Sequence, residues 1–171
     1  MKRAADGGRE TMEWTVKRFD QLSARELYEI YRLRVSIFVV EQNCPYQEVD
    51  EADPLSYHVW LRDGEEIVAY LRVIPADVSF EDVSIGRVIA VRRRCGLGTR
   101  IVREGLRVAR EKLGASRITI EAQTYARALY EKLGFRAISA EFLEDGIPHI
   151  RMCWESAQET DGMGEKNEKS L

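Results

Sequence analysis

The sequence predicts one domain of the α/β (α+β) class, in which helices flank a single mixed, largely antiparallel sheet. The 171-residue chain is 44% hydrophobic and 32% charged, which is typical of a globular domain large enough to bury a core. Strand-like and helix-like segments alternate along residues 12–155. Several predicted strands follow one another without an intervening helix, and this order excludes a doubly wound parallel sheet.

The first half of the domain opens with a short strand at 13–19. A helix follows, because Ser23 and Glu26 form a capping box that satisfies the free amides of a first turn. The helical pattern weakens near 38–46, where polar residues and a proline predict a loop. Two strands then form a hairpin around an Asp-Gly turn, at 57–61 and 66–74.

The second half begins with a strand at 83–91 that leads through a glycine-containing loop into an amphipathic helix. The β-branched run at 117–122 predicts a buried strand, and a further helix at about 125–133 ends at a glycine. Two last strands flank Asp145-Gly146 and close an antiparallel hairpin. The sheet is therefore expected to contain about seven strands.

Composition also limits the kind of protein. Cys44, Cys95 and Cys153 have no paired C-x-x-C spacing, so we expect neither a disulfide framework nor a metal site. No apolar run approaches the roughly 18 residues of a membrane span, and the N-terminus lacks the apolar stretch of a signal peptide. We therefore expect a cytoplasmic protein without a membrane partner. The polar, aperiodic ends, 1–11 and 156–171, are predicted to be disordered tails.

Charge is unevenly distributed, although 26 Lys and Arg against 29 Asp and Glu leave a net charge of only −3. Residues 92–112 hold seven Arg and one Lys against two Glu, a local balance of +6 that suits an anionic ligand. Residues 41–53 contain five carboxylates and no basic residue, which indicates either the entrance for a cationic acceptor or a solvated loop. The five are Glu41, Glu48, Asp50, Glu51 and Asp53, with Arg34 and Arg87 as candidates to neutralise part of them. A total near neutrality disfavours nucleic acid as the main partner.

The loop at 93–99 is the first candidate for the anion site, because it joins a strand to a helix and contains two glycines. Glycines let the backbone approach a ligand closely, and the first amides of a helix bind phosphate. The loop lacks the Lys of a P-loop and the third Gly of the dinucleotide fingerprint. Four arginines on the outside of the following helix are interpreted as a solvated face: Arg100, Arg103, Arg107 and Arg110.

Two motifs in this region resemble the signatures of the GNAT acetyltransferases. The first motif is Arg93-Arg94-Cys95-Gly96-Leu97-Gly98, which is similar to the family signature R/Q-x-x-G-x-G/A. The other is LYEKLGF at 129–135, which is similar to the second signature of the family. The ElaA branch of that superfamily is resembled by three more segments, at 38–50, 85–91 and 144–150. The resemblance covers residues 12–155 and implies a GNAT fold, whose sheet is splayed between its fourth and fifth strands.

The resemblance further implies acetyl-CoA as the co-substrate, with no metal. It places the diphosphate on the loop at 93–99 and pairs the pantetheine arm with the end of the strand at 83–91. The residues implied to contact the cofactor are Ile89, Ala90, Val91, Arg93, Arg94, Cys95, Gly96, Leu97, Gly98, Thr99, Gln123 and Ala126. Many relatives carry Asn where Gln123 stands, and an amide is retained. Independently of the family, backbone amides and guanidinium groups in this loop suit the phosphates of CoA.

The same resemblance places Tyr130 in the position of the family's general acid, beside the sulfur of the departing CoA. A phenol with a pKa of about 10 is protonated at neutral pH and can give its proton to a thiolate, whereas a core tyrosine on an apolar helix face is the alternative. The general base stays open, because the strand at 83–91 lacks the Glu that many relatives carry. His149 and Glu121 are the first candidates and His58 is the third, and a water chain to solvent could serve instead.

The leading hypothesis is direct transfer of an acetyl group from acetyl-CoA to a primary amine in a ternary complex, by a monomer or a homodimer. A backbone amide near Ile89 to Val91 would stabilise the oxyanion. Two alternatives stay open. One is a CoA-binding regulatory or partner module without catalysis, which the missing strand carboxylate motivates. The other is an acyltransferase similar to the acyl-homoserine lactone synthases, which FVVEQ and the following acidic stretch resemble.

Overall fold

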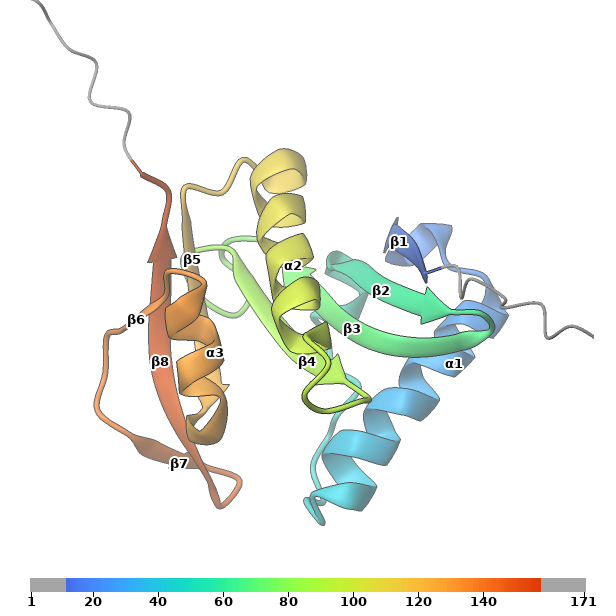
Figure 1. The fold of residues 1–171 in the computed structure, drawn as a ribbon, viewed down its shortest axis with the longest axis horizontal. Coiled ribbons are helices and arrows are strands. Elements are labelled where there is room, and N and C mark those ends of the chain that lie inside the picture. Colours follow the sequence, from blue (N-terminus) through green and yellow to red (C-terminus); the bar gives the residue numbers. More distant parts are fainter. Residues whose placement is uncertain (1–11, 158–171) are drawn as a thin grey trace, which may run out of the picture.

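The computed structural model describes residues 12–157, which form two four-stranded sheets with helices packed on them (Figure 1). The predicted mixed α/β architecture with mostly antiparallel strands is confirmed. The predicted tails at 1–11 and 156–171 lie outside the described residues, except for Ser156 and Ala157. Within residues 12–157, every helix is too short or too polar to cross a membrane.

The first sheet has four antiparallel strands in the order β1-β2-β3-β4. They are β1 (Met12–Arg18), β2 (Tyr57–Asp63), β3 (Glu66–Ile74) and β4 (Ser84–Ala90). All of β3 beyond its first residue is buried, because one apolar cluster covers each face of this sheet. A nearly continuous apolar run therefore replaces the alternating pattern of a half-exposed strand.

The second sheet is built around β8, which pairs with every other strand of that sheet. Its members are β5 (Arg117–Gln123), β6 (Arg136–Ala137), β7 (Phe142–Glu144) and β8 (Ile147–Glu155). Among the described residues, one parallel bridge joins β5 to Val83, the residue before β4, where Thr119 N–H donates to Val83 O (3.0 Å). Away from that bridge the two strands separate, as Figure 1 shows. The predicted splay between the fourth and fifth strands is thus present.

Two helices lie on opposite faces of the first sheet. α1 (Ala24–Val35) begins at the predicted capping box, in which Glu26 N–H donates to Ser23 Oγ (3.1 Å) and Ser23 N–H donates to Glu26 Oε2 (2.9 Å). α2 (Leu97–Leu113) lies so close to β3 that a Cβ added to Gly105 would stand 2.7 Å from a methyl group of Leu71. A larger residue at position 105 would have to displace the side chains of Leu71 and Ile85, on which the helix backbone packs directly.

Helical structure continues past α1 as a π-helix at Ser36–Glu41, in part of the segment for which the sequence predicted a loop. Its hydrogen bonds reach five residues back, as in Gln42 N–H to Ile37 O (3.3 Å). Ile37 and Phe38 pack against the apolar cluster beneath α1. Tertiary packing therefore extends the helix beyond the point where local propensity weakens.

The helix that follows β5 starts as a 3-10 turn at Thr124–Ala126 and continues as α3 (Arg127–Lys132). It ends before Gly134, whose φ of +94° is a conformation that favours glycine. The helix predicted at 125–133 is therefore present with nearly the expected bounds. Its Tyr130 and the following Phe135 belong to the core cluster shared by the two sheets.

His58 on β2 is fully buried, and both of its ring nitrogens are hydrogen-bonded. The carbonyl oxygen of Asp53 can only accept, so Nε2 carries the proton (3.0 Å) and Nδ1 accepts from the hydroxyl of Tyr70 (2.8 Å). Burial lowers the pKa of His58 below its ordinary value of 6.5, although the Asp53 carbonyl favours the charged form. The imidazole is therefore a neutral structural element, which removes His58 from the candidates for the general base.

We predict that the free energy of unfolding decreases as the pH falls below 6.5, because the unfolded chain then binds a proton that folded His58 does not. The slope contributed by this residue is at most about 1.4 kcal/mol per pH unit. Urea denaturation between pH 7.5 and pH 5.5 measures it. His58→Gln should flatten the dependence, whereas His149→Gln, at the other of the two histidines, should not. An unchanged slope in His58→Gln would contradict the assignment.

Candidate active site

A groove of about 1430 Å³ follows the opening between β4 and β5. It extends from the loop before α2, past α3, to the turn between β7 and β8. The residues that the sequence placed in the site line it as follows: Ile89, Ala90, Val91, Arg93, Arg94, Gly96, Leu97, Gly98, Thr99, Glu121, Gln123, Ala126, Tyr130 and His149. Cys95 is the exception, since it is exposed on the loop and its thiol contacts Arg92 O (3.2 Å).

The loop before α2 presents unpaired backbone amides to one end of the groove. Arg94 and Gly96 have φ values of +61° and +75°, so the chain turns sharply into the helix. No side chain caps the first turn of α2, which leaves its first amides free for an anion. A Cβ on Gly98 would stand 3.3 Å from Leu129, and this close approach fixes the start of α2 against α3.

Three arginines line the same end of the groove. Arg92 is held by Asp63 (3.0 Å), whereas Arg93 and Arg94 have no ion-pair partner among residues 12–157. The arginines on the outer face of α2 lie outside the groove and are exposed, as predicted for a solvated face. Arg107, for example, pairs with Glu104 and Glu111 on its own helix. Arg93 and Arg94 are therefore the cations available to a phosphate in the groove.

The edge of β4 facing the groove carries backbone groups that the first sheet does not use. Val91 N–H donates to Val68 O on β3 (2.9 Å). Because alternate amides of an antiparallel strand point to opposite sides, the N–H of Ala90 points away from β3. The sequence suggested an amide near Ile89 to Val91 as the donor to the oxyanion. Of these amides, the N–H of Ala90 lies on the open side of β4.

β4 bulges in its central part. Two of its residues, Arg87 and Val88, stand opposite a single residue of β3, Leu71. Arg87 has a φ of +55°, which is uncommon for a residue with a side chain. The bulge re-aims the backbone of β4 next to the groove.

Tyr130 on α3 is 6% exposed, and its ring packs edge-on against Phe135 with the centroids 5.5 Å apart. No hydrogen bond to its hydroxyl occurs among residues 12–157. Burial, and to a smaller extent Tyr125, raises the pKa of Tyr130 above its ordinary value. The phenol is therefore protonated at neutral pH, as is expected for a tyrosine from the sequence alone.

The remaining base candidates lie on paired strands at the other end of the groove. His149 Nδ1 lies 2.7 Å from Ile147 O, so this nitrogen carries the proton and Nε2 keeps its lone pair. Glu144 is the nearest carboxylate, 3.8 Å from Nε2. Glu121 accepts a hydrogen bond from Arg151 (2.6 Å). The geometry leaves the lone pair of His149 free and ties the Glu121 carboxylate to a cation.

Gln42 is a groove residue that sequence reasoning missed. Its amide and that of Gln123 donate to each other, at 3.3 and 3.5 Å, and so bridge the end of the π-helix and the end of β5. Both residues line the groove. Gln42 and Gln123 are 81 residues apart in the sequence, so no local pattern could have predicted their contact.

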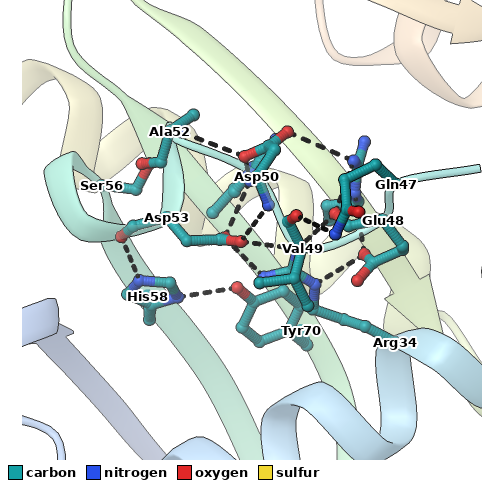
Figure 2. A network of polar contacts seen from close by, with 12 residues as sticks. Arg34, Gln47, Glu48, Val49, Asp50, Ala52, Asp53, Ser56, His58 and Tyr70 are labelled. Carbon is teal, nitrogen blue, oxygen red and sulfur yellow. Dashed lines mark hydrogen bonds and ion pairs between the residues drawn. The ribbon is translucent and has the colours of Figure 1, made fainter.

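The acidic segment at 41–53 is mostly not a free acidic entrance. Three of its carboxylates are bound by arginines in a group that we name the ion-pair cluster (Figure 2). It consists of Arg34, Glu48, Asp50, Asp53, Arg72 and Arg87. The expectation that Arg34 and Arg87 neutralise part of this segment is confirmed, and Arg72 is a further partner. The segment therefore does not present five free negative charges, because folding brings in basic partners from other elements. Glu41 and Glu51 remain exposed.

Glu48 lies between two guanidinium groups that bind it in the same way. Nε of Arg34 and Nε of Arg87 both donate to Glu48 Oε1, at 2.7 and 2.9 Å. Nη2 of each arginine donates to Glu48 O, at 3.1 and 2.9 Å. Glu48 thus joins α1 and β4 to its own loop at 42–56.

Asp53 and Asp50 connect the cluster to β3. Asp53 Oδ1 accepts from Arg34 (2.6 Å) and from Arg72 (2.8 Å), and Asp50 accepts two bonds from Arg72 (2.6 and 2.8 Å). Burial opposes the charges of these carboxylates, but the hydrogen bonds and charges of the arginines outweigh it and hold the pKa of each aspartate below its ordinary value. Their ion pairs therefore contribute stability at neutral pH.

Arg72 was not singled out from the sequence, although a signal for it exists. It is the one charged residue inside the apolar stretch IVAYLRVI of β3. An arginine in a strand covered on both faces needs a buried acidic partner. The pattern could have predicted a buried ion pair, but not which acid completes it.

Comparisons with known proteins identify the family to which this fold and groove belong. Residues 32–156 match the family described as the acetyltransferase (GNAT) domain. The chain belongs to this family.

Within this family, the chain is similar to ElaA. ElaA of Escherichia coli is 34% identical over 151 residues, which are 86% of this chain and 99% of ElaA. The crystal structure of Escherichia coli ElaA superimposes with a TM-score of 0.79, covering 85% of this chain and 100% of that chain. A UPF0039 protein of Schizosaccharomyces pombe is 40% identical over 145 residues, 82% of this chain and 95% of the relative. The crystal structure of an acyl-CoA N-acyltransferase from Pseudomonas aeruginosa has 38% identity and a TM-score of 0.75, with 83% and 99% coverage.

We predict that Asp53→Asn lowers the free energy of unfolding by about 3–5 kcal/mol, because it leaves Arg34 and Arg72 buried with too little negative charge. Urea denaturation at pH 7 measures the loss. Glu51→Gln, an exposed carboxylate of the same segment, is the control and should change stability by less than about 0.5 kcal/mol. Equal effects of the two substitutions would show that the cluster adds no stability.

Proposed function

We propose that the protein transfers an acetyl group from acetyl-CoA to a primary amine, by direct attack within a ternary complex. The observation that carries this proposal is the continuity of one groove. It joins a loop of free amides and arginines, an open strand edge and a protonated tyrosine. Family membership supports the transfer of an acyl group, and the geometry supports the roles of particular residues.

Acetyl-CoA fits the groove by the chemistry of its parts. Its diphosphate would accept from the first amides of α2 and from Arg93 and Arg94, which carry charges not used elsewhere in the described residues. Its pantetheine arm has amide groups that can pair with the open edge of β4. The thioester would then lie beside Ala90 and Tyr130.

The reaction balances with groups that line the groove. The amine nitrogen forms a bond to the thioester carbon, and the carbonyl oxygen, now negative, accepts from the N–H of Ala90. The C–S bond then breaks, and the electron pair leaves on sulfur. The proton lost by the nitrogen goes to Nε2 of His149, whose lone pair the Ile147 carbonyl keeps available.

Tyr130 stabilises the leaving sulfur mainly as a hydrogen-bond donor. A thiol with an unperturbed pKa of about 8.5 is a stronger acid than a phenol whose pKa is raised above 10, so the thiolate has little tendency to take the phenolic proton outright. A donated hydrogen bond stabilises the charge without that cost. Burial of the ring against Phe135 holds the donor in place.

Some acidic groups at the proposed acceptor end of the groove do not belong to the ion-pair cluster. Glu41, Glu144 and Asp145 line this end and have no arginine or lysine partner among residues 12–157. Glu121 is neutralised by Arg151. The remaining negative charges favour a cationic acceptor such as a protonated amine, which gives one proton to solvent before its neutral form attacks and a second proton to His149 as the N–C bond forms.

The proposal predicts release of free CoA thiol from acetyl-CoA that depends on an added amine, and we expect Tyr130→Phe to lower this turnover about 100-fold. A thiol reagent follows the reaction with a panel of small primary amines, polyamines and peptides. Tyr57→Phe, which removes a hydroxyl from another tyrosine packed on the same core, is the matched control and should retain activity. Full turnover in Tyr130→Phe would contradict its role, and tight CoA binding without thiol release would favour a CoA-binding module.

We expect His149→Gln to lower kcat about 100-fold at neutral pH, because no base remains to accept the proton of the amine. Turnover is measured with both substrates saturating. Glu121→Gln serves as the comparison. A loss of turnover in Glu121→Gln instead of His149→Gln would assign the base to Glu121, and full turnover in both variants would assign it to solvent.

A further inference from the structure

Arg87 occupies an unusual place, because it combines a strained backbone with a side chain bound on several sides. It lies in the bulge of β4, its φ is +55°, and the strand that it interrupts forms one wall of the groove. Such a conformation persists in a residue with a side chain only when its surroundings hold it.

The surroundings of the side chain provide that hold. Its guanidinium donates to Glu48 Oε1 and Glu48 O, both at 2.9 Å, and to Asp50 Oδ2 at 3.4 Å. The rings of Phe38 and Tyr46 lie 5.9 and 5.5 Å from its central carbon. Glu48 is in turn bound by Arg34 of α1. The bulge is thereby tied to α1 through Glu48 and Arg34, the pair labelled in Figure 2.

The bulge lies directly before the part of β4 beside which the thioester lies in the proposed function. Arg87 is three residues from Ala90, whose N–H points to the open side of the strand. A shift of the bulge changes the direction of the strand that follows it. The conformation of Arg87 therefore sets where the Ala90 amide points.

We propose that Arg87 is a positioning residue, which uses its bonds to Glu48 and Asp50 to hold the β4 bulge and so to aim the Ala90 amide at the reacting carbonyl. The catalytic part of this statement rests on the proposed function. The structural part, that the side chain holds the bulge, stands independently of any activity.

The test uses three substitutions in the full-length chain. Arg87→Ala removes the side-chain bonds. Arg87→Gly also removes them but relieves the backbone strain, and Arg87→Lys keeps the charge without the paired donors. Arg62→Ala is the matched control, because the Arg62 side chain is also 21% exposed and ion-paired but lies outside the groove.

The first measurement is amide hydrogen exchange of a peptide spanning 84–91, which requires no catalysis. We expect faster exchange there in Arg87→Ala and Arg87→Gly, with other strands unchanged, and no such change in Arg62→Ala. Unchanged exchange at 84–91 in both variants would overturn the proposal. If Arg87→Ala does not fold, Arg87→Lys carries the same measurement.

The second measurement is kcat and KM for acetyl-CoA and for the acceptor. We expect kcat to fall about 10- to 100-fold in Arg87→Ala and Arg87→Gly, less in Arg87→Lys, with KM for acetyl-CoA unchanged. Wild-type kcat in Arg87→Gly would show that the side-chain bonds are dispensable. A raised KM for the acceptor with unchanged kcat would make Arg87 an acceptor ligand instead, and both results overturn the proposal. Absence of thiol release by the wild-type protein would refute the proposed function, while the exchange pattern still decides whether Arg87 holds the bulge.

Discussion

The separation of β4 from β5 is the constraint on which the rest of this structure depends. Backbone N–H and C=O groups at a strand edge need partners, and one bridge near Val83 leaves most of the facing edge of β4 without them. The two halves are held together instead by the core cluster that α2 shares with both sheets. A fold that keeps two neighbouring strands apart therefore supplies an extended polar edge inside a groove, which suits a ligand with amide groups of its own.

The ion-pair cluster meets a second requirement, which is to hold the wall of the groove that β4 and the loop at 42–56 form. Three guanidinium groups and three carboxylates balance in charge, so that their burial does not leave a net charge in the interior. Four different parts of the chain contribute to it: α1, the loop at 42–56, β3 and β4. Because paired charges in a largely buried site require particular geometry, the cluster determines the position of the loop more strictly than apolar packing would. His58 and Tyr70 extend this network toward β2.

Local patterns predicted most of the elements, for identifiable reasons. The capping box at Ser23, the amphipathic face of α2 and the β-branched run of β5 each carry their signal within a few residues. The π-helix at Ser36–Glu41 was missed because it depends on the packing of Ile37 and Phe38 against a distant strand. Propensity and period describe a segment in isolation, and this segment is helical only in its tertiary context.

The sequence by itself determined the family, the order of the elements and the glycine-containing loop before α2, because those properties reside in short contiguous motifs such as Arg93–Gly98 and 129–135. Only the tertiary structure decided which charges are free. In the sequence, Glu48, Asp50 and Asp53 form an acidic stretch. In the folded protein they are paired with arginines that lie 14 to 39 residues away along the chain, namely Arg34, Arg72 and Arg87. It likewise decided which nitrogen of His149 is available and which amide of β4 faces the groove. Hydrogen bonds and ion pairs depend on distances of a few ångströms between atoms, and distance along the chain does not specify them.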